Sequence, residues 1–355
     1  MNAAFRRAEE FAQQFGLKIP ILLAPMAGSC PPSLSIAIAN AGGLGGCGAL
    51  RMTPVAIMDW AREVRSHSNG AFQMNLWIPD LPPVRDAERE ARLRAFLERW
   101  GPHVPADMAE PGQFDFDAQC EALLACEAPV VSSIMGLYPA PFVRQLKAKG
   151  VAWFATVTTV AEARAAVEAG ADVIVAQGSE AGGHRGAFEP ERAERQLVGL
   201  FALLPAVVDA VDVPVVATGG IADARGITAA LALGASAVQI GTGFLRCPEA
   251  KLHPVWAEQL GRTKPEDTAV TRAFTGRAAR GVANAFVVAA NGPDAPTAMA
   301  YPLQRDLTAA MRDDAARQGD AERMQLWAGQ SAALAKALPA GDLARALWSQ
   351  AVEGP

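Results

Sequence analysis

Eight short apolar segments, each followed by a stretch of helix-forming residues, constrain the fold of this 355-residue chain more than any other feature. They are rich in β-branched residues and show little polar alternation, which is typical of strands buried on both faces of a parallel sheet. Such a chain can form a closed eight-stranded barrel or an open sheet covered by helices on both faces. The segments lie at residues 21–26, 43–49, 72–78, 129–135, 151–158, 172–177, 213–218 and 235–240.

A weak internal repeat favours the barrel. Gly170 and Gly234 each end a helix-forming stretch and precede a predicted strand. They lie 64 residues apart, which leaves room for two strand–helix units of ordinary size. We therefore predict an α/β protein with a (β/α)8 TIM barrel over residues 1–250, and an open doubly wound sheet is the alternative.

Two regions do not follow the strand–helix pattern. Residues 79–115, after the third predicted strand, are rich in proline and in charges of both signs, so we expect a surface insertion with a solvated helix. Residues 251–355 show no further strand pattern, and we expect a helical extension packed on the barrel. Amphipathic patterns predict helices over 306–318 and 321–338, the second with an apolar stripe of Leu326, Trp327, Leu334 and Leu338.

Composition disfavours several functional classes. The 32 basic and 37 acidic residues give a net charge of −5, which is not the basic footprint of a nucleic-acid-binding protein. No apolar run approaches the roughly 20 residues of a membrane span, and acidic residues precede any apolar run, so we expect neither a membrane anchor nor a signal peptide. The five cysteines form no Cys-x-x-Cys pair, which favours a reduced, cytoplasmic protein without disulfides. A homodimer face could involve Trp60, Trp100, Trp327 and Trp348, although core packing is the simpler interpretation.

In a barrel, the functional site lies where the carboxyl ends of the strands meet. The first predicted strand ends in Pro25, Met26 and Ala27, which could lie against a flat ring or serve only as a turn. Asn75 is polar within an apolar strand. Because a buried amide without partners is costly, Asn75 needs either a neighbouring strand end or a ligand.

The segment after the sixth predicted strand carries the strongest signal. His184 and Arg185 are flanked by Gly182, Gly183 and Gly186 in a loop that can approach an anion or a ring closely. Of the four histidines, only His184 falls at a strand end, where it could act as a general base; a surface loop histidine is the alternative. Arg185 could add positive charge, point to solvent or pair with an acid. No second ligand is placed for a metal site, so none is predicted.

Glycines end the seventh and eighth predicted strands, at Gly219-Gly220 and Gly241-Thr242. Main-chain N–H groups and helix N-termini at two consecutive barrel strands can bind a phosphate without a lysine. Glycines used only for tight turns are the alternative. A phosphorylated cofactor with a flat ring fits these features, and FMN is the natural candidate. Pyridoxal phosphate is disfavoured because no lysine stands at a strand end.

These segments resemble the nitronate monooxygenases, formerly called 2-nitropropane dioxygenases. The resemblance covers roughly residues 19–250 and continues at Tyr301-Pro302 and at 327–330. It implies noncovalent FMN and oxidation of alkyl nitronates, and of nitroalkanes, by O2 to a carbonyl compound and nitrite through one-electron transfer to the flavin. The motifs that carry it are 24–28, 177–186, 217–221 and 239–242.

The resemblance also implies residue roles. His184 would take the α-proton of a neutral nitroalkane and then hold the nitronate anion, with Ser133 and Tyr301 as further substrate-binding residues. Some family members carry a tyrosine and lysine cluster after the barrel, whereas Arg305 stands one helical turn after Tyr301 here, which leaves the substrate open. The residues implied to line FMN are Pro25, Met26, Ala27, Asn75, Gln177, Gly182, Gly183, Gly219, Gly220, Gln239, Gly241 and Thr242.

The cofactor loops do not separate three functions. The first is the oxidation of nitronates, and the second is an NAD(P)H-dependent FMN reductase acting on quinones or enoyl thioesters. The third is a flavin- or phosphate-binding barrel with no catalysis of its own. Rapid bleaching of a bound flavin by NADH or NADPH without oxygen would distinguish the second from the first.

Overall fold

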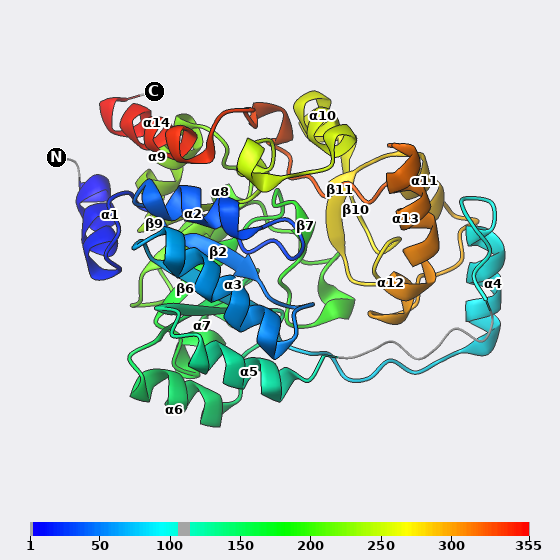
Figure 1. Ribbon diagram of the computed structural model, residues 1–355, viewed down its shortest axis with the longest axis horizontal. Helices are drawn as coiled ribbons and strands as arrows, with labels where there is room; N and C mark the ends of the chain where they lie inside the picture. The colour runs from blue at the N-terminus through cyan, green and yellow to red at the C-terminus, as the bar shows by residue number, and fades with distance from the viewer. Residues whose placement is uncertain (1–2, 106–113, 355) are drawn as a thin grey trace.

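A computed structural model describes residues 3–105 and 114–354 and contains a parallel eight-stranded barrel (Figure 1). The strands follow the order β1-β9-β8-β6-β5-β4-β3-β2, and the ring closes where Leu22 of β1 pairs with Leu44 beside β2. Each strand lies within its predicted segment, so the predicted barrel is confirmed. The strands are β1 (Ile21–Leu23), β2 (Gly45–Gly48), β3 (Phe72–Trp77), β4 (Val130–Ile134), β5 (Ala152–Val157), β6 (Val173–Gln177), β8 (Val215–Thr218) and β9 (Ala237–Ile240).

Helices surround the barrel, and the last one comes from the far end of the chain. No long helix directly follows β9; α14 (Ala340–Glu353) instead packs on both α9 and α2 and completes the outer ring. The two chain ends therefore lie on the same side of the barrel in Figure 1. The other helices of the ring are α2 (Pro32–Asn40), α3 (Pro54–His67), α5 (Phe116–Ala125), α6 (Ala140–Ala148), α7 (Val160–Glu168), α8 (Leu200–Val208) and α9 (Ala224–Ala232).

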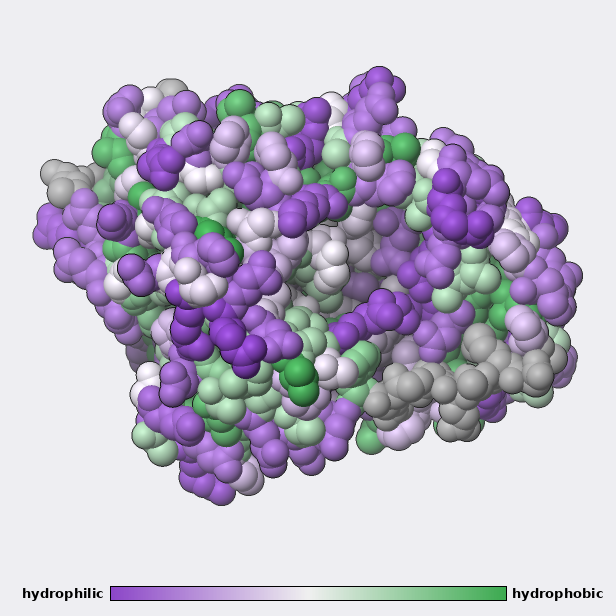
Figure 2. Space-filling model, in the orientation of Figure 1, coloured by the Kyte–Doolittle hydropathy of each residue, from purple (hydrophilic) through white to green (hydrophobic). Residues whose placement is uncertain are grey.

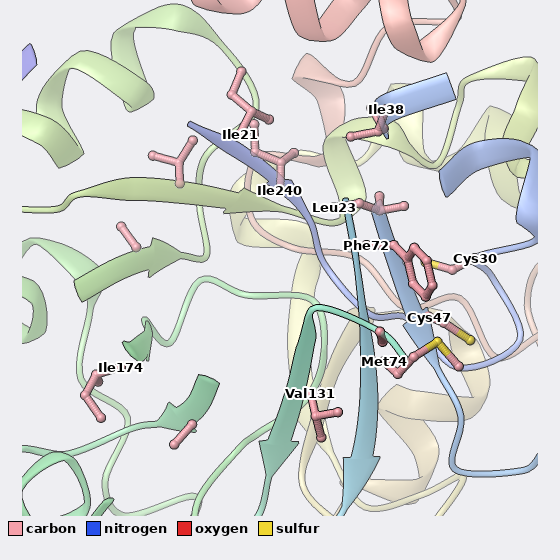
Figure 3. Close-up of a cluster of buried hydrophobic side chains, with 14 of the residues drawn as sticks. Ile21, Leu23, Cys30, Ile38, Cys47, Phe72, Met74, Val131, Ile174 and Ile240 are labelled. Carbon is pink, nitrogen blue, oxygen red and sulfur yellow. The ribbon is translucent and has the colours of Figure 1, made fainter. Parts of the chain in front are cut away.

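Side chains of each strand alternate between two apolar layers, because successive residues point to opposite faces. Ile21 and Leu23 pack outward with Ile38 of α2, in the layer shown in Figure 3. Leu22 points into the barrel instead, in a separate cluster that also holds Phe154 of β5. Helix α1 (Ala3–Gln14) and the turn after it add Phe11 and Phe15 to this inner cluster, with the Phe15 and Phe154 rings 5.0 Å apart.

A second lobe lies beside the barrel, at the right of Figure 1. Its core joins Phe96 and Leu97 of α4 (Ala87–Leu97), in the insertion, to Phe274, Phe286 and Leu307 of the C-terminal region. The apolar face of the insertion helix is therefore buried within the chain, although charged residues cover its other side. Part of the predicted insertion, 106–113, lies outside the described residues. The lobe also contains α11 (Ala285–Ala290), α12 (Leu303–Leu307) and α13 (Ala309–Gln318).

The sequence pattern predicted a helical C-terminal region, but the structure also contains strands there. An antiparallel sheet joins β10 (Thr268–Thr271), β11 (Ala279–Val282) and the two-residue β7 (Gly183–His184) from the barrel. The helix prediction for 306–318 is close, since α12 and α13 meet at Thr308. The prediction for 321–338 is wrong, because the backbone there pairs with β11 through a bridge between Trp327 and Gly281 and then forms only a short 3₁₀ turn, η5 (Ala332–Leu334).

The four tryptophans considered for a dimer face each contact another ring of the same chain, although only Trp60 is fully buried. Trp60 is buried against Phe72, Trp348 contacts Phe5, and Trp100 contacts Phe286. Trp327 lies against His184. All five cysteines are buried and free. Over the described ranges, no helix is both long enough and apolar enough to cross a bilayer.

The packing of α14 on the barrel generates a stability prediction. Leu347 is 3% exposed in this helix, so Leu347→Ala should leave a cavity and lower the free energy of unfolding by about 2–5 kcal/mol. Leu338→Ala is the matched control, because Leu338 is 46% exposed and its truncation should cost less than about 1 kcal/mol. Urea denaturation followed by fluorescence measures both. Equal losses in the two variants would contradict the placement of α14 in the ring.

Candidate active site

A cavity of about 480 Å³ opens at the carboxyl ends of the barrel strands, within the range typical of small-molecule sites. The face shown in Figure 2 is hollowed between the barrel and the second lobe. Every predicted site residue except Ser133 lines the cavity. The set is Pro25, Met26, Ala27, Asn75, Gln177, Gly182, Gly183, His184, Gly219, Gly220, Gln239, Gly241, Thr242 and Tyr301.

The structure does not bring Ser133 to the cavity with the other predicted site residues. Ser133 is fully buried, and its hydroxyl accepts a hydrogen bond from Trp153 Nε1 at 3.0 Å and donates one to the carbonyl of Gly136 at 3.3 Å. The neighbouring Ser132 faces the interior of the barrel instead and bonds to Asn75 and Gln73. Because side chains alternate along a strand, only one of the two serines can face the site.

The loop that carries His184 is held on two sides. On the barrel side, the Gln177 amide donates to the carbonyl of His184 at 3.0 Å and accepts from the N–H of Gly186 at 2.8 Å. On the other side, Gly183 and His184 pair with Arg280 and Ala279 of β11. The side chain of His184 is therefore presented from a short strand rather than from a free loop.

Arg185 does not face solvent, and it forms no ion pair with an acid of residues 3–105 or 114–354. Its guanidinium is 1% exposed and donates to the carbonyl of Gly178 at 2.6 Å and to that of Gln177 at 3.1 Å. Burial lowers the pKa of Arg185 to about 10, so the side chain is still charged at neutral pH. Its role is to satisfy the carbonyl groups where β6 ends and the loop begins.

Two tryptophans and a threonine surround the His184 ring. Trp77 and Trp327 contact it edge to face, with ring centroids 4.6 and 5.3 Å away, and Thr275 Oγ1 lies 2.9 Å from Nε2. Burial, together with the positive charge of Arg277, lowers the pKa of His184 from 6.5 to about 3. His184 is therefore neutral at pH 7, the form that can accept a proton.

A network of amides lies across the bottom of the cavity. Gln73 Nε2 donates to Gln239 Oε1 at 3.1 Å, Ser132 donates to Gln73 Oε1 at 2.9 Å, and Asn75 Nδ2 donates to Ser132 Oγ at 3.1 Å. Within the described part of the chain, Asn75 Oδ1 and Gln239 Nε2 have no hydrogen-bond partner. Because both residues line the cavity, one acceptor and one donor remain for a ligand.

The glycine-rich strand ends form a cradle of main-chain N–H groups. Gly219 and Gly220 both have positive φ angles, +110° and +70°, a backbone conformation that glycine adopts without strain. In the residues that the structure covers, the N–H groups of Gly219, Gly220, Gly241 and Thr242 have no hydrogen-bond partner. These donors lie where a phosphate would bind at the ends of the last two barrel strands.

Three arginines line the cavity from separate elements. Arg51 follows β2 and has no hydrogen bond or ion pair among residues 3–105 and 114–354, whereas Arg305 pairs with the adjacent Asp306 at 3.0 Å. Arg312 donates to the carbonyl of Arg305 at 2.8 Å. Burial and the charge of Arg305 lower the pKa of Arg312 to about 10 and that of Arg51 below its usual value. Asp313 offsets part of this charge, so the cluster is moderately cationic.

Sequence reasoning did not assign several residues that line this site. Trp77, Trp327 and Thr275 surround His184, and Arg51 and Arg312 join Arg305 at the cavity. Trp77 could have been found, because it ends the same strand as Asn75 and lies two residues beyond it, on the same inward-facing side of the strand. The others depend on how the C-terminal region folds over the barrel, which strand and helix periodicity does not specify. No group of three or more metal-ligating side chains comes together in the described residues.

Comparison with known proteins agrees with the geometry. The family model for nitronate monooxygenase matches residues 9–350. A nitronate monooxygenase of Pseudomonas aeruginosa is 40% identical, covering 96% of this chain and 98% of its own length. A probable nitronate monooxygenase of Bacillus subtilis is 37% identical, covering 90% and 92%. This chain belongs to the nitronate monooxygenase family.

Solved structures show the same architecture. The nitroalkane oxidase of Streptomyces ansochromogenes superimposes with a TM-score of 0.86 at 37% identity and covers 97% of this chain and 98% of its own. FabK from Thermotoga maritima gives a TM-score of 0.75 at 28% identity, with 97% and 96% covered. Both likenesses extend through the C-terminal region, so the second lobe is part of the shared fold.

The low pKa of His184 generates a stability prediction. Because the folded-state value of about 3 lies below the unfolded value of 6.5, the unfolded chain binds more protons between these limits. The free energy of unfolding should therefore fall as the pH drops below 6.5, by up to about 1.4 kcal/mol per pH unit from this group. His184→Asn should lose this component. Denaturation of wild type and variant at pH 7.5 and 5.5 measures the difference, and identical pH dependence would contradict a neutral His184.

Proposed function

We propose that this chain is an FMN-dependent nitronate monooxygenase that oxidises alkyl nitronates with O2 to a carbonyl compound and nitrite. The observation that carries the proposal is the placement of neutral His184 in the same cavity as the open N–H cradle, with cationic side chains at the cavity wall. Membership of the nitronate monooxygenase family and the likeness to a nitroalkane oxidase support it.

The residues present fit FMN. Gly219, Gly220, Gly241 and Thr242 would hold the phosphate through their free main-chain N–H groups. Asn75 and Gln239 offer one free acceptor and one free donor for the polar edge of a flavin ring, as described above. When bound, the flavin supplies one-electron chemistry that a protein side chain cannot provide.

The chain's own residues would bind substrate and move a proton. A nitronate is an anion, and Arg51, Arg305 and Arg312 would attract and hold it. For a neutral nitroalkane, His184 would accept the α-proton, and the nitronate formed beside it would then stabilise the imidazolium. The aromatic rings of Trp77 and Trp327 beside His184 would exclude water and strengthen these charge interactions.

The test is an oxygen-electrode trace on purified, flavin-loaded protein after adding a small alkyl nitronate, with no nicotinamide present. The proposal predicts rapid O2 uptake with matching nitrite release. A flat trace, followed by rapid bleaching of the flavin by NADH or NADPH without oxygen, would instead favour the reductase. A flat trace without bleaching would favour a binding protein without catalysis.

The cellular setting and assembly are proposed separately. We propose a cytoplasmic location because all five cysteines are free and buried, as in proteins of a reducing compartment. A homodimer stays a prediction, with no support from the tryptophans. Light scattering at micromolar concentration measures the mass directly.

The N–H cradle generates a prediction about flavin retention. Gly220→Ala places a Cβ on a residue with φ of +70° and 3.2 Å from Glu180 Cβ, so the backbone of the cradle should be distorted and flavin affinity should fall by roughly tenfold or more. Gly319→Ala is the matched control, because φ is +65° there and Gly319 ends α13 outside the cavity. Flavin release on dilution, followed by fluorescence, measures both. Equal flavin loss in the two variants would contradict the cradle.

The arginine cluster generates a prediction about substrate charge. Arg305→Gln should raise KM for a nitronate by roughly fivefold to tenfold and change KM for the neutral nitroalkane less, because only the anion gains from the positive charge. Arg317→Gln, on the exposed side of α13 and paired with Asp314, is the control with little expected effect. Steady-state kinetics at low salt gives both constants. The same change for both substrates would argue against charge recognition.

A further inference from the structure

We propose that Thr275 is a positioning residue that fixes the tautomer of His184, with the proton on Nε2 and the lone pair on Nδ1. Nδ1 is then the nitrogen that takes the proton from the substrate. This last step rests on the proposed function, whereas the tautomer itself rests only on hydrogen bonds of this chain.

Thr275 belongs to the C-terminal region, whose strand β11 pairs with the strand β7 that carries His184. It lies in the turn between β10 and β11, is 3% exposed, and lines the same cavity as the histidine. Its Oγ1 lies 2.9 Å from His184 Nε2 and 3.3 Å from the carbonyl oxygen of Arg277, to which it donates. One hydroxyl therefore links the imidazole to a main-chain carbonyl.

The Thr275 hydroxyl has only one proton, so the group to which it donates fixes the direction of both hydrogen bonds. If Thr275 donates to Arg277, then Oγ1 accepts from His184, and Nε2 must carry a proton. If Thr275 donated to Nε2 instead, the Arg277 carbonyl would lose that donor and the proton of His184 would move to Nδ1. No described residue is hydrogen-bonded to Nδ1, so that arrangement leaves both the Nδ1 proton and the Arg277 carbonyl without partners, whereas the first leaves only the lone pair of Nδ1. Buried polar groups are satisfied wherever possible, which favours the first arrangement.

Arg277, whose carbonyl accepts from Thr275, is held in place by its side chain. Arg277 is 4% exposed, and its Nε donates to Asp80 Oδ2 at 2.7 Å, while its Nη1 donates to the carbonyl of Ala187 at 3.3 Å. The imidazole is held as well, by the edge-to-face contacts of Trp77 and Trp327. Thr275 therefore bridges two groups that cannot easily move away from it.

The tautomer has a chemical consequence. When a nitroalkane loses its α-proton, the C–H bond breaks, the proton goes to Nδ1, and the electron pair enters the C=N bond of the nitronate. His184 then carries protons on both nitrogens, and Nε2–H keeps its acceptor in Thr275 Oγ1. A hydrogen bond to a charged donor is stronger than one to a neutral donor, so Thr275 also stabilises the protonated ring.

The tautomer can be measured without any reaction. Long-range proton–nitrogen spectra of nitrogen-15 histidine-labelled protein at neutral pH distinguish protonated from unprotonated ring nitrogens. Only four histidines contribute, and His184→Asn identifies the signal of interest. We expect the Nε2–H pattern in wild type and in Thr275→Ser, and loss of that single pattern in Thr275→Val, because neither ring nitrogen then keeps a fixed hydrogen-bond partner among the described residues.

A matched control is available in the same region. Thr308 is fully buried and its hydroxyl donates to the carbonyl of Phe274 at 2.7 Å, but it is not hydrogen-bonded to His184. Thr308→Val should leave the His184 pattern unchanged. An Nδ1–H pattern in wild type, or a wild-type pattern in correctly folded Thr275→Val, would overturn the proposal.

Steady-state kinetics then tests whether Nδ1 of His184 accepts the proton of the substrate. Thr275→Val should lower kcat/KM for a neutral nitroalkane by about tenfold to a hundredfold, while Thr275→Ser restores it and preformed nitronate is affected far less. Equal losses on both substrates would overturn the assignment of Nδ1 as the base. If the spectra show the expected tautomer but no nitronate is turned over, the proposed function fails and the positioning role of Thr275 stands.

Discussion

The pairing of the two-residue strand β7 with β11 is the constraint on which the site depends. It joins the loop after the sixth barrel segment to the C-terminal region, through Gly183 with Arg280 and His184 with Ala279. A glycine-rich loop alone would be free to move, and its histidine would be solvated. Because β7 is paired with β11, His184 is enclosed by Trp77 from the barrel and Trp327 from the C-terminal region. This enclosure lowers the pKa of His184.

The path of the chain after β9 explains how the pairing of β7 with β11 is maintained. The chain leaves the barrel, builds the second lobe together with the insertion helix α4, and returns to place α14 between α9 and α2. The lobe is thus anchored at both ends of its sequence. The cavity lies between two packed cores, and its wall of arginines belongs to the lobe and to the loop after β2, while the N–H cradle belongs to the barrel.

Strand and helix periodicity predicted the barrel well because buried parallel strands and their glycine-ended connections leave a local signature. The same logic located His184, Asn75 and the glycine cradle, since barrel sites form at strand ends. Ser133, which came from the family resemblance, does not line the cavity, because apolar strands give no sign of which face a small polar residue takes. Periodicity failed at 321–338, where pairing of Trp327 with Gly281 overrides a helical pattern. Thr275 and the arginines were not assigned, because their roles arise from tertiary packing alone.

The central claim is that His184 acts as a neutral base beside a bound nitronate. The most direct measurement compares kcat/KM of wild type and His184→Asn on a neutral nitroalkane and on the preformed nitronate of the same compound. The account predicts a loss of about 10² or more on the nitroalkane and a much smaller loss on the nitronate. Equal losses on the two substrates would contradict it and would leave His184 as an anion-binding group only.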